Sequence, residues 1–243
     1  MIYKTRGIVF HSIKYADTSL ITRIYTEKFG LQSYIVRGAR KPRARMKASL
    51  FQALSLLEME VYHKEKSSLQ NIKEAKVDGV FTSIPFDIRK SSIAMFLGDV
   101  LTKTIKEEEA NPDLFYFLDI MIRELDNQED DMADFHLVFM VHLSKYLGFF
   151  PQGIYHEHKH FFDLKEGSFC TGQPEHTHYI PPPLSEQLSS IIQQHPLEHL
   201  SYKHTRETRN QLLEALIKYY RLHYEGMQEI QSHLILKEIF DNP

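Results

Sequence analysis

Apolar and polar residues alternate with a period of two along the first third of the chain. The alternating segments are rich in Ile, Val, Tyr and Thr, and a polar turn or a glycine separates most of them, as expected for short β-strands. The predicted strands are residues 6–13, 19–26, 31–37, 54–63 and 68–77. The turn Lys28-Phe29-Gly30 suits a tight hairpin, because glycine adopts the backbone angles that such a turn needs. Five short strands within residues 1–80 predict a small barrel such as an OB-fold.

After residue 83 the apolar residues recur with the period of an α-helix. A first helix is predicted to end near residues 107–109, and Asn111 and Pro112 provide a cap and a first turn for the next. Further predicted helices are residues 133–147, 184–194, 207–224 and 233–240, with an acidic linker at 126–131 and an irregular, His-rich insertion at about 149–183. The predicted fold class is α+β: a five-stranded OB-fold barrel at residues 1–80, followed by an α-helical domain at residues 81–243.

Composition limits the class of protein. The chain has 243 residues, of which 42% are hydrophobic and 25% charged, so one or two packed domains are expected rather than a disordered or fibrous chain. We expect a cytoplasmic protein without a membrane partner, because no run of about 18 apolar residues is present and the first residues do not resemble a signal peptide. The single cysteine, Cys170, excludes an internal disulfide and agrees with a reducing compartment.

Charge is distributed unevenly along the chain. Residues 1–47 contain eleven Lys and Arg but only two acidic residues, a balance of +9, whereas the remaining 196 residues carry −12. The density is highest in the basic segment, residues 37–47, where RGARKPRARMK contains six cations and no carboxylate. A polyanion, most often a nucleic-acid backbone, is the expected ligand of such a segment. An acidic membrane surface, an acidic protein or a merely solvated loop are the alternatives.

Aromatic residues accompany these cations. Tyr15, Tyr25, Phe29 and Tyr34 lie on or next to the strands that carry Arg23, Lys28 and Arg37. Rings among cations are typical of single-strand binding, in which bases stack on rings while cations follow the phosphates. The competing interpretation is that each ring packs in the core of the barrel, as most Phe and Tyr of strands do.

Histidines suggest a metal site, but with unfavourable spacing. His156, His158 and His160, then Cys170, then His176 and His178 occur within 23 residues. On an extended strand the first three would share a face, although structural zinc sites usually have two residues between paired ligands and here there is one. Catalysis has weaker support, because no Walker-type phosphate loop, GxSxG or HExxH motif is present. A metal-dependent nuclease at the histidines therefore remains only the weakest of the candidate functions.

Long stretches of the chain resemble a known family. GIVFHSIKYADTSLITRIYTEKFG at residues 7–30, the following YIVRGARKPRARMK, and LLEALIKYYRLHYEGMQEIQSHLILKEIF near the C-terminal end are similar to the bacterial recombination mediator RecO. The resemblance extends in order over nearly the whole sequence. It implies an N-terminal OB domain, a helical C-terminal domain and no enzymatic turnover.

The resemblance also implies ligands and partners. Proteins of the RecO family bind single- and double-stranded DNA, anneal complementary strands, and work with RecR to load RecA onto DNA coated by single-strand-binding protein. The implied localisation is cytoplasmic and nucleoid-associated. The residues expected to face DNA are Arg6, Arg23, Lys28, Tyr34, Arg37, Arg40, Lys41, Arg43, Arg45 and Lys47. A docking adaptor whose basic segment binds the acidic tail of a partner protein is the alternative from another class.

One departure from the family concerns zinc. Many members have a four-cysteine zinc site after an LGxxP string, which here is residues 147–151. The corresponding positions in this chain are His156, Lys159, Cys170 and Gln173, and two of these four cannot ligate zinc in the usual way. We therefore expect no cofactor and no bound metal.

Overall fold

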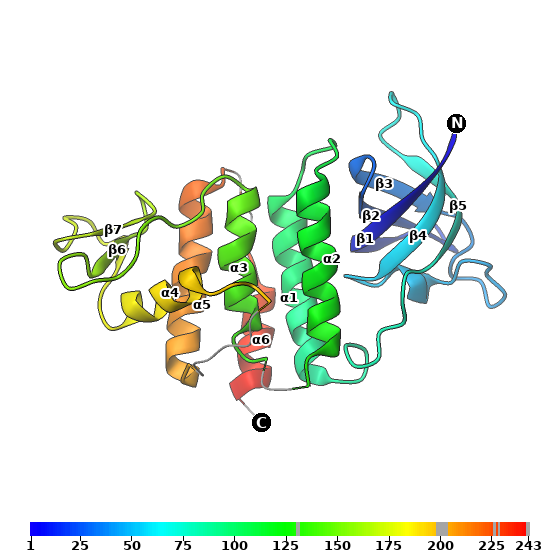
Figure 1. The fold of residues 1–243 in the computed structure, drawn as a ribbon. Coiled ribbons are helices and arrows are strands. Elements are labelled where there is room, and N and C mark those ends of the chain that lie inside the picture. Colours follow the sequence, from blue (N-terminus) through cyan, green and yellow to red (C-terminus); the bar gives the residue numbers. More distant parts are fainter. Residues whose placement is uncertain (130–131, 198–203, 226, 228, 242–243) are drawn as a thin grey trace. The chain divides into compact units, whose positions relative to one another are not determined.

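The chain forms two compact units, which are described one at a time. The computed structural model describes all residues from 1 to 243 except 130–131, 198–203, 226, 228 and 242–243 (Figure 1). The first unit is Met1–Asn127 and the second is Gln128–Pro243. Part of the predicted acidic linker, residues 130–131, lies outside the described residues. The sequence predicts a domain boundary between residues 80 and 81, whereas the first compact unit extends to Asn127. The predicted boundary stays a prediction.

Five strands of the first unit close into a barrel, which confirms the predicted architecture. They are β1 (Ile2–Tyr15), β2 (Ser19–Thr26), β3 (Gly30–Val36), β4 (Leu56–Tyr62) and β5 (Gln70–Val77). Their order around the barrel is β1-β2-β3-β5-β4. Strand β1 is longer than predicted because it pairs twice, with β4 through residues 2–8 and with β2 through residues 7–15.

Alternate residues of these strands fill the barrel. Ile24 on β2, Val36 on β3 and Val61 on β4 are fully buried and belong to one apolar core. The short 3-10 helix η1 (Ala48–Phe51) adds Phe51 to this core. The strands are therefore amphipathic, and their second set of residues faces outward.

Two helices of the same unit cover part of the outer barrel surface. They are α1 (Ile88–Thr104) and α2 (Pro112–Asn127), which stand beside the barrel in Figure 1. Phe10 of β1 stacks on Tyr25 of β2, with ring centroids 5.6 Å apart, and Tyr25 stacks on Phe115 of α2 at 6.3 Å. Burial raises the pKa of Tyr25 to about 12. The outward-facing rings of β1 and β2 at this level are thus unavailable to a ligand.

Asp126, near the end of α2, holds the segment that leads from the barrel to α1. Its carboxylate accepts hydrogen bonds from the backbone N–H groups of Thr82, Ser83 and Ile84, at 2.8, 3.0 and 2.8 Å. The buried ammonium of Lys90 donates to the backbone carbonyl of Asp126 at 2.8 Å. One side chain therefore fixes the start of α1 relative to the end of α2.

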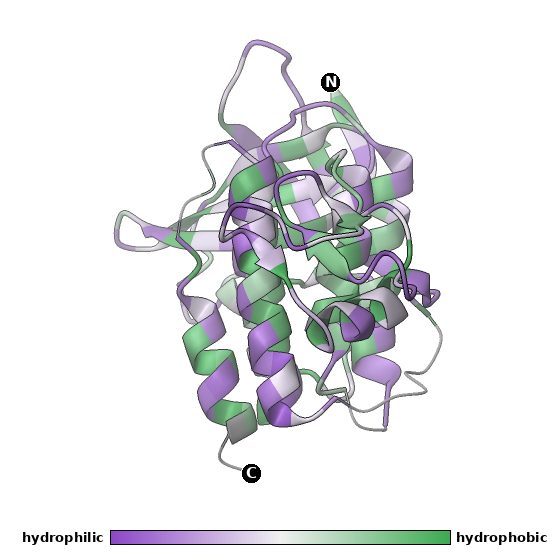
Figure 2. Cartoon of the chain, turned by 90° about the vertical axis from the view of Figure 1, so that its left-hand side faces the viewer, coloured by the Kyte–Doolittle hydropathy of each residue, from purple (hydrophilic) through white to green (hydrophobic). Residues whose placement is uncertain are grey.

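The second unit packs helices around a buried α3 (Phe135–Tyr146). The others are α4 (Leu184–Gln193), α5 (Arg206–His223) and α6 (Ser232–Asp241), close to the predicted ranges. Tyr220 of α5 is fully buried and donates to the carbonyl of Met140 at 2.6 Å. In Figure 2 polar and apolar residues alternate along the helices, as expected where one side packs and the other meets water.

The segment predicted to be irregular contains a small sheet. Strands β6 (Phe161–Asp163), β7 (Ser168–Cys170) and β8 (Tyr179–Ile180) pair in the order β7-β6-β8. These strands have two or three residues each, too few for an alternating pattern to be recognised in the sequence. Phe162 of β6 connects the sheet to α5, because its ring centroid lies 5.9 Å from that of Tyr219.

Candidate nucleic-acid interface

The basic segment, residues 37–47, joins β3 to η1 as an ordered series of turns. Gly38 has a φ of +71°, and its carbonyl accepts from the N–H of Lys41 at 3.0 Å. The next turn is closed by the N–H of Ala44 and the carbonyl of Lys41 at 3.1 Å. Ala39 is buried in the barrel core and Met46 packs against the same core, so the segment is attached at two points. Its cations therefore project from a defined backbone.

Two of the six cations have polar side-chain partners. Arg37 donates to Asn71 at 2.7 Å, and Arg45 forms an ion pair with Glu74 at 2.9 Å. Both side chains of the ion pair are largely exposed, so the pair contributes about 0–1 kcal/mol. Asn71 and Glu74 lie on β5, which brings this strand next to the segment.

The other four cations have no carboxylate partner in the part of the chain that the structure describes. They are Arg40, Lys41, Arg43 and Lys47, all exposed. The guanidinium of Arg40 donates to the backbone carbonyl of Asp17, at 3.1 Å. The segment thus keeps a local excess of positive charge that is available to an anionic ligand.

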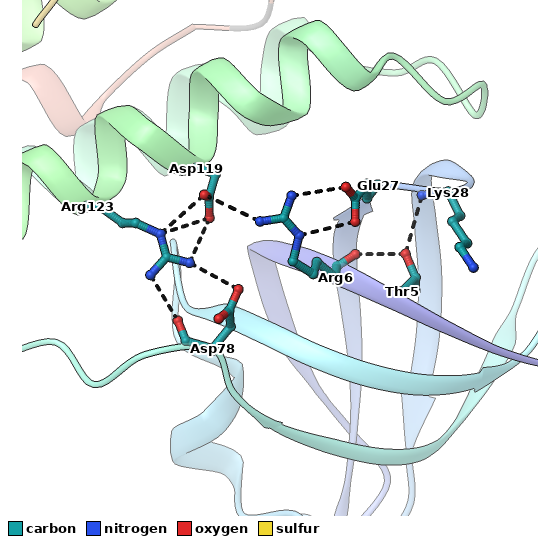
Figure 3. A network of polar contacts seen from close by, with 7 residues as sticks. All are labelled: Thr5, Arg6, Glu27, Lys28, Asp78, Asp119 and Arg123. Atoms are coloured by element: carbon teal, nitrogen blue, oxygen red, sulfur yellow. Dashed lines mark hydrogen bonds and ion pairs between the residues drawn. The ribbon is translucent and has the colours of Figure 1, made fainter.

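Arg6 does not belong to this set. Its guanidinium donates to Glu27 at 3.0 and 3.2 Å and lies 3.6 Å from Asp119, which also pairs with Arg123 (Figure 3). The hydrogen bond with Glu27 raises the pKa of Arg6 and lowers that of Glu27. Arg6 is neutralised by two carboxylates, a pairing over long sequence separations that no local pattern reveals. It therefore departs from the expectation that it faces DNA.

Tyr34 requires a correction. It was expected to face DNA, but its side chain points into the barrel and is fully buried in the apolar core. Burial raises the pKa of its hydroxyl. The ring cannot stack on a base, so Tyr34 is a packing residue.

Lys28 is exposed and Arg23 is partly exposed, and both lie outside the basic segment. Lys28 lies in the β2–β3 turn, at the end of β3 opposite residue 37. Seven residues of strand extend about 23 Å, so Lys28 and the basic segment lie at opposite ends of β3. Arg23, in the middle of β2, pairs in register with His11 and Ser33. The structure therefore gathers the six cations of residues 37–47 and leaves Lys28 apart.

The outer face of β4 and β5 neutralises its own charges. Glu60 pairs with Lys73 at 2.6 Å, and Glu58 pairs with Lys76 at 2.7 Å. The hydrogen bond from Lys73 holds the pKa of Glu60 below its usual value. A polyanion gains little on this face, so the positive excess is directed to one side of the barrel.

The outer face of β1, β2 and β3 carries an apolar row that sequence reasoning missed. Ile13, Ile21 and Ile35 lie side by side across the three strands in one register. Ile13 is 49% exposed, and Ile21 and Ile35 are partly exposed. We call these three residues the isoleucine row. Ile21 and Ile35 alternate with buried residues of β2 and β3, but both alternate sets of β3 mix apolar and polar residues, so strand parity alone does not reveal the row in the sequence.

The zinc positions do not form a ligand set. His156 and Lys159 are joined by two backbone hydrogen bonds, and the Lys159 ammonium cannot ligate. The amide of Gln173 donates to the hydroxyl of Tyr179 at 2.8 Å. Among the described residues no group of three or more His, Cys, Asp or Glu is placed to hold a metal ion. The residues present do not fit zinc, and a metal-free protein remains a prediction for metal analysis.

No described helix is both long enough and apolar enough to span a bilayer.

Comparisons with known proteins cover nearly the whole chain. Residues 1–81 match the family model "Recombination protein O N terminal", and residues 85–229 match "Recombination protein O C terminal". A protein of Bacteroides fragilis named DNA repair protein RecO is 38% identical over 242 residues, covering 99% of this chain and 100% of its own. A protein of the same name from Flavobacterium johnsoniae is 39% identical over 246 residues, with the same two coverages.

Both relatives are named DNA repair proteins, and the expectation that this protein is not an enzyme is consistent with those names. The closed barrel followed by helices agrees with the fold that the resemblance implied. From the two family models and the full-length relatives, we conclude that the chain belongs to the RecO family of DNA repair proteins.

Proposed function

We propose that this protein binds single- and double-stranded DNA through the basic segment and anneals complementary strands. The observation that carries the proposal is the set of four exposed cations, Arg40, Lys41, Arg43 and Lys47, without a carboxylate partner among the described residues. Cations of this kind contact phosphate oxygens and release condensed counterions, which gives affinity without choice of sequence. Arg37 and Arg45 add to the set when DNA replaces their present partners.

Annealing requires no catalytic group in this proposal. Two approaching strands repel through their phosphates, and a surface that neutralises one strand lowers this repulsion. The self-neutralised face of β4 and β5 directs the strand to one side of the barrel. The protein then acts as a scaffold for pairing in a repair pathway.

The family resemblance supports the wider role. We propose that the protein works with RecR at DNA coated by single-strand-binding protein and assists the loading of RecA there. A nucleoid-associated, cytoplasmic localisation follows from this role. The second unit is the proposed docking surface for protein partners.

The salt dependence of DNA affinity tests the proposal. Each phosphate contact on a single strand contributes about −0.7 to the slope of log K against log salt, so replacing Arg40, Lys41, Arg43 and Lys47 by Ala should flatten the slope by roughly 2.8. Between about 50 and 200 mM salt, the affinity ratio of wild type to variant should therefore shrink by roughly 50-fold. Annealing of complementary oligonucleotides should slow in the same variant.

A matched control removes four cations from elsewhere on the same unit. Lys64, Lys66, Lys73 and Lys76 lie on β5 and the turn that precedes it, and all four are exposed. Their replacement by Ala changes the net charge equally but should leave most of the slope intact. Equal losses in both variants, or no loss in the first, would refute a site at the basic segment. Binding to an acidic peptide but not to bare oligonucleotides would favour the adaptor instead.

A further inference from the structure

The insertion between α3 and α4 has two turns at one end of its small sheet. The first turn, residues 156–159, lies one residue before β6, and the second turn, residues 170–173, begins at the last residue of β7. Phe161 and Cys170 are opposite each other in the pairing of β6 with β7, so both turns start from the same end of the sheet. These turns contain the four positions that correspond to zinc ligands in the family, and their side chains here do not fit zinc.

The first turn is fixed at both ends by α4. The backbone N–H of Tyr155, just before the turn, donates to the hydroxyl of Ser189 at 3.0 Å. The backbone carbonyl of His160, just after the turn, accepts a hydrogen bond from the hydroxyl of Ser185. Both serines are buried, and a spacing of four residues places them on one face of the helix. Two hydroxyl groups of one helix therefore hold the chain on either side of the first turn.

The second turn and the loop that follows it are fixed by strands β6 and β8. The amide of Gln173 donates to the hydroxyl of Tyr179 on β8 at 2.8 Å. Further along the loop, Nε2 of His176 lies 3.2 Å from the carboxylate of Asp163 on β6. The same buried carboxylate accepts from two backbone N–H groups of the turn between β6 and β7, at 2.8 and 3.2 Å. One acidic side chain thus joins this turn to the loop before β8.

Aromatic rings add an apolar contact between the insertion and the helices. Phe162 of β6 lies between two rings, with centroid distances of 5.0 Å to Phe169 of β7 and 5.9 Å to Tyr219 of α5. Phe161 meets Tyr179 of β8 edge to face at 5.7 Å. Strands of two or three residues cannot hold a sheet together by themselves, so these side-chain contacts decide whether the insertion is ordered.

We propose that the insertion is held together without a metal, because Ser185 and Ser189 of α4 and the carboxylate of Asp163 supply the cross-links that a zinc ion supplies in family members with four cysteines. A structural zinc ion joins two turns through bonds to both, and such elements unfold when the metal is removed. Here each turn is instead bonded to a neighbouring helix or strand, and the hydrogen bonds are buried, where they are costly to leave unmade. The inference concerns the second unit alone and is independent of the proposed DNA binding.

The test combines zinc analysis of the purified full chain with hydrogen exchange of residues 152–180, measured by mass spectrometry without metal, with added zinc and with EDTA. The first variant, S185A/S189A, removes both hydroxyl groups that hold the first turn. Its control, S190A, removes a hydroxyl of the same helix that donates only within the helix, to the carbonyl of Gln187. The second variant, H156C/K159C/Q173C, completes a four-cysteine set with Cys170.

The wild type should contain no stoichiometric zinc, and its exchange should be the same in all three buffers. In S185A/S189A, exchange at residues 154–162 should be faster by about tenfold or more, because each buried hydrogen bond that is lost shifts local opening by roughly that factor. Added zinc should not reverse this change, and S190A should resemble the wild type. H156C/K159C/Q173C should bind zinc stoichiometrically, and zinc should restore slow exchange when these three changes are combined with S185A/S189A.

Several results would overturn the inference. Stoichiometric zinc in the wild type, or faster exchange of the wild type in EDTA, would show that a metal holds the insertion. Unchanged exchange in S185A/S189A would show that the serines do not. Failure of zinc to bind the cysteine set, or to restore slow exchange in the combined variant, would show that the serines do not take the place of a metal cross-link. If S185A/S189A unfolds as a whole, the two measurements on the wild type still decide the question.

Discussion

Removing the carboxylate of Asp126 should destabilise the first unit substantially. The Asp126→Ala change leaves three backbone N–H groups, those of residues 82–84, without their acceptor. Hydrogen bonds to charged groups contribute about 1.5–3 kcal/mol each, and water can replace some of them because Thr82 is exposed. The nearby Lys90 ammonium, which is 4% exposed, also loses a neighbouring negative charge. A loss of about 3–4 kcal/mol in the free energy of unfolding is expected.

Chemical denaturation followed by circular dichroism measures this loss. Asp126→Asn keeps one carbonyl acceptor and should lie between Ala and wild type, whereas Asp113→Ala at an exposed position of the same helix should cost under about 1 kcal/mol. Burial alone would raise the pKa of Asp126, but the hydrogen bonds from Ile84, Thr82 and Ser83 outweigh it and lower the pKa. The stabilisation is therefore complete above the unfolded pKa, near 3.9, and is lost as the pH falls through the lower folded value. A loss below about 1 kcal/mol at pH 7 for the alanine variant would refute the role assigned to this carboxylate.

Three further changes test other features. Gly30 has a φ of +62°, and a Cβ added there would lie 2.3 Å from the backbone carbonyl oxygen of Glu109, so Gly30→Ala should cost about 1–3 kcal/mol of stability. A thermal melt measures this loss, and an unchanged melt would contradict it. Glu74→Gln frees Arg45 and should raise DNA affinity about twofold at low salt. The control, Glu58→Gln, frees Lys76 instead and should change the affinity less. Equal effects of the two variants would indicate a response to net charge alone. Burial lowers the pKa of His136 to about 4 from its ordinary 6.5. As the pH falls, the imidazole is therefore protonated in the unfolded chain before it is protonated in the folded protein. About 3 kcal/mol of stability should be lost between pH 6.5 and 4. His136→Asn should flatten that part of the curve of stability against pH, and an unchanged curve would exclude His136 as its cause.

The sequence predicted the barrel well because alternation is a local property. Both β2 and β3 lie within a residue of their predicted ends. The extension of β1 to Ile2 and Tyr15 was missed because it depends on pairing with two partners, β4 and β2. The small sheet of β6, β7 and β8 was missed for a related reason, since its strands are shorter than one repeat of a recognisable pattern.

Site residues were harder to predict than strands. In LQSYIV of β3 both alternate sets contain apolar and polar residues, so the sequence does not reveal that Tyr34 points inward while Ile35 points outward. Arg6 looked like a free cation because Glu27 and Asp119 are 21 and 113 residues away in the chain. The basic segment was predictable because its excess charge is contiguous in the sequence, and the one carboxylate that pairs with it, Glu74, leaves most of its cations without a partner of this kind.

The exposed position of the basic segment on the outside of the barrel affects how DNA can reach the protein. A ligand on the outside of a closed barrel lies on an open surface and is not enclosed in a channel. A strand held there as proposed can arrive and depart sideways, so it needs no free end. Circular single strands and internal gaps should then be as accessible as broken ends, and the exposed edge of the bound strand stays open to its complement.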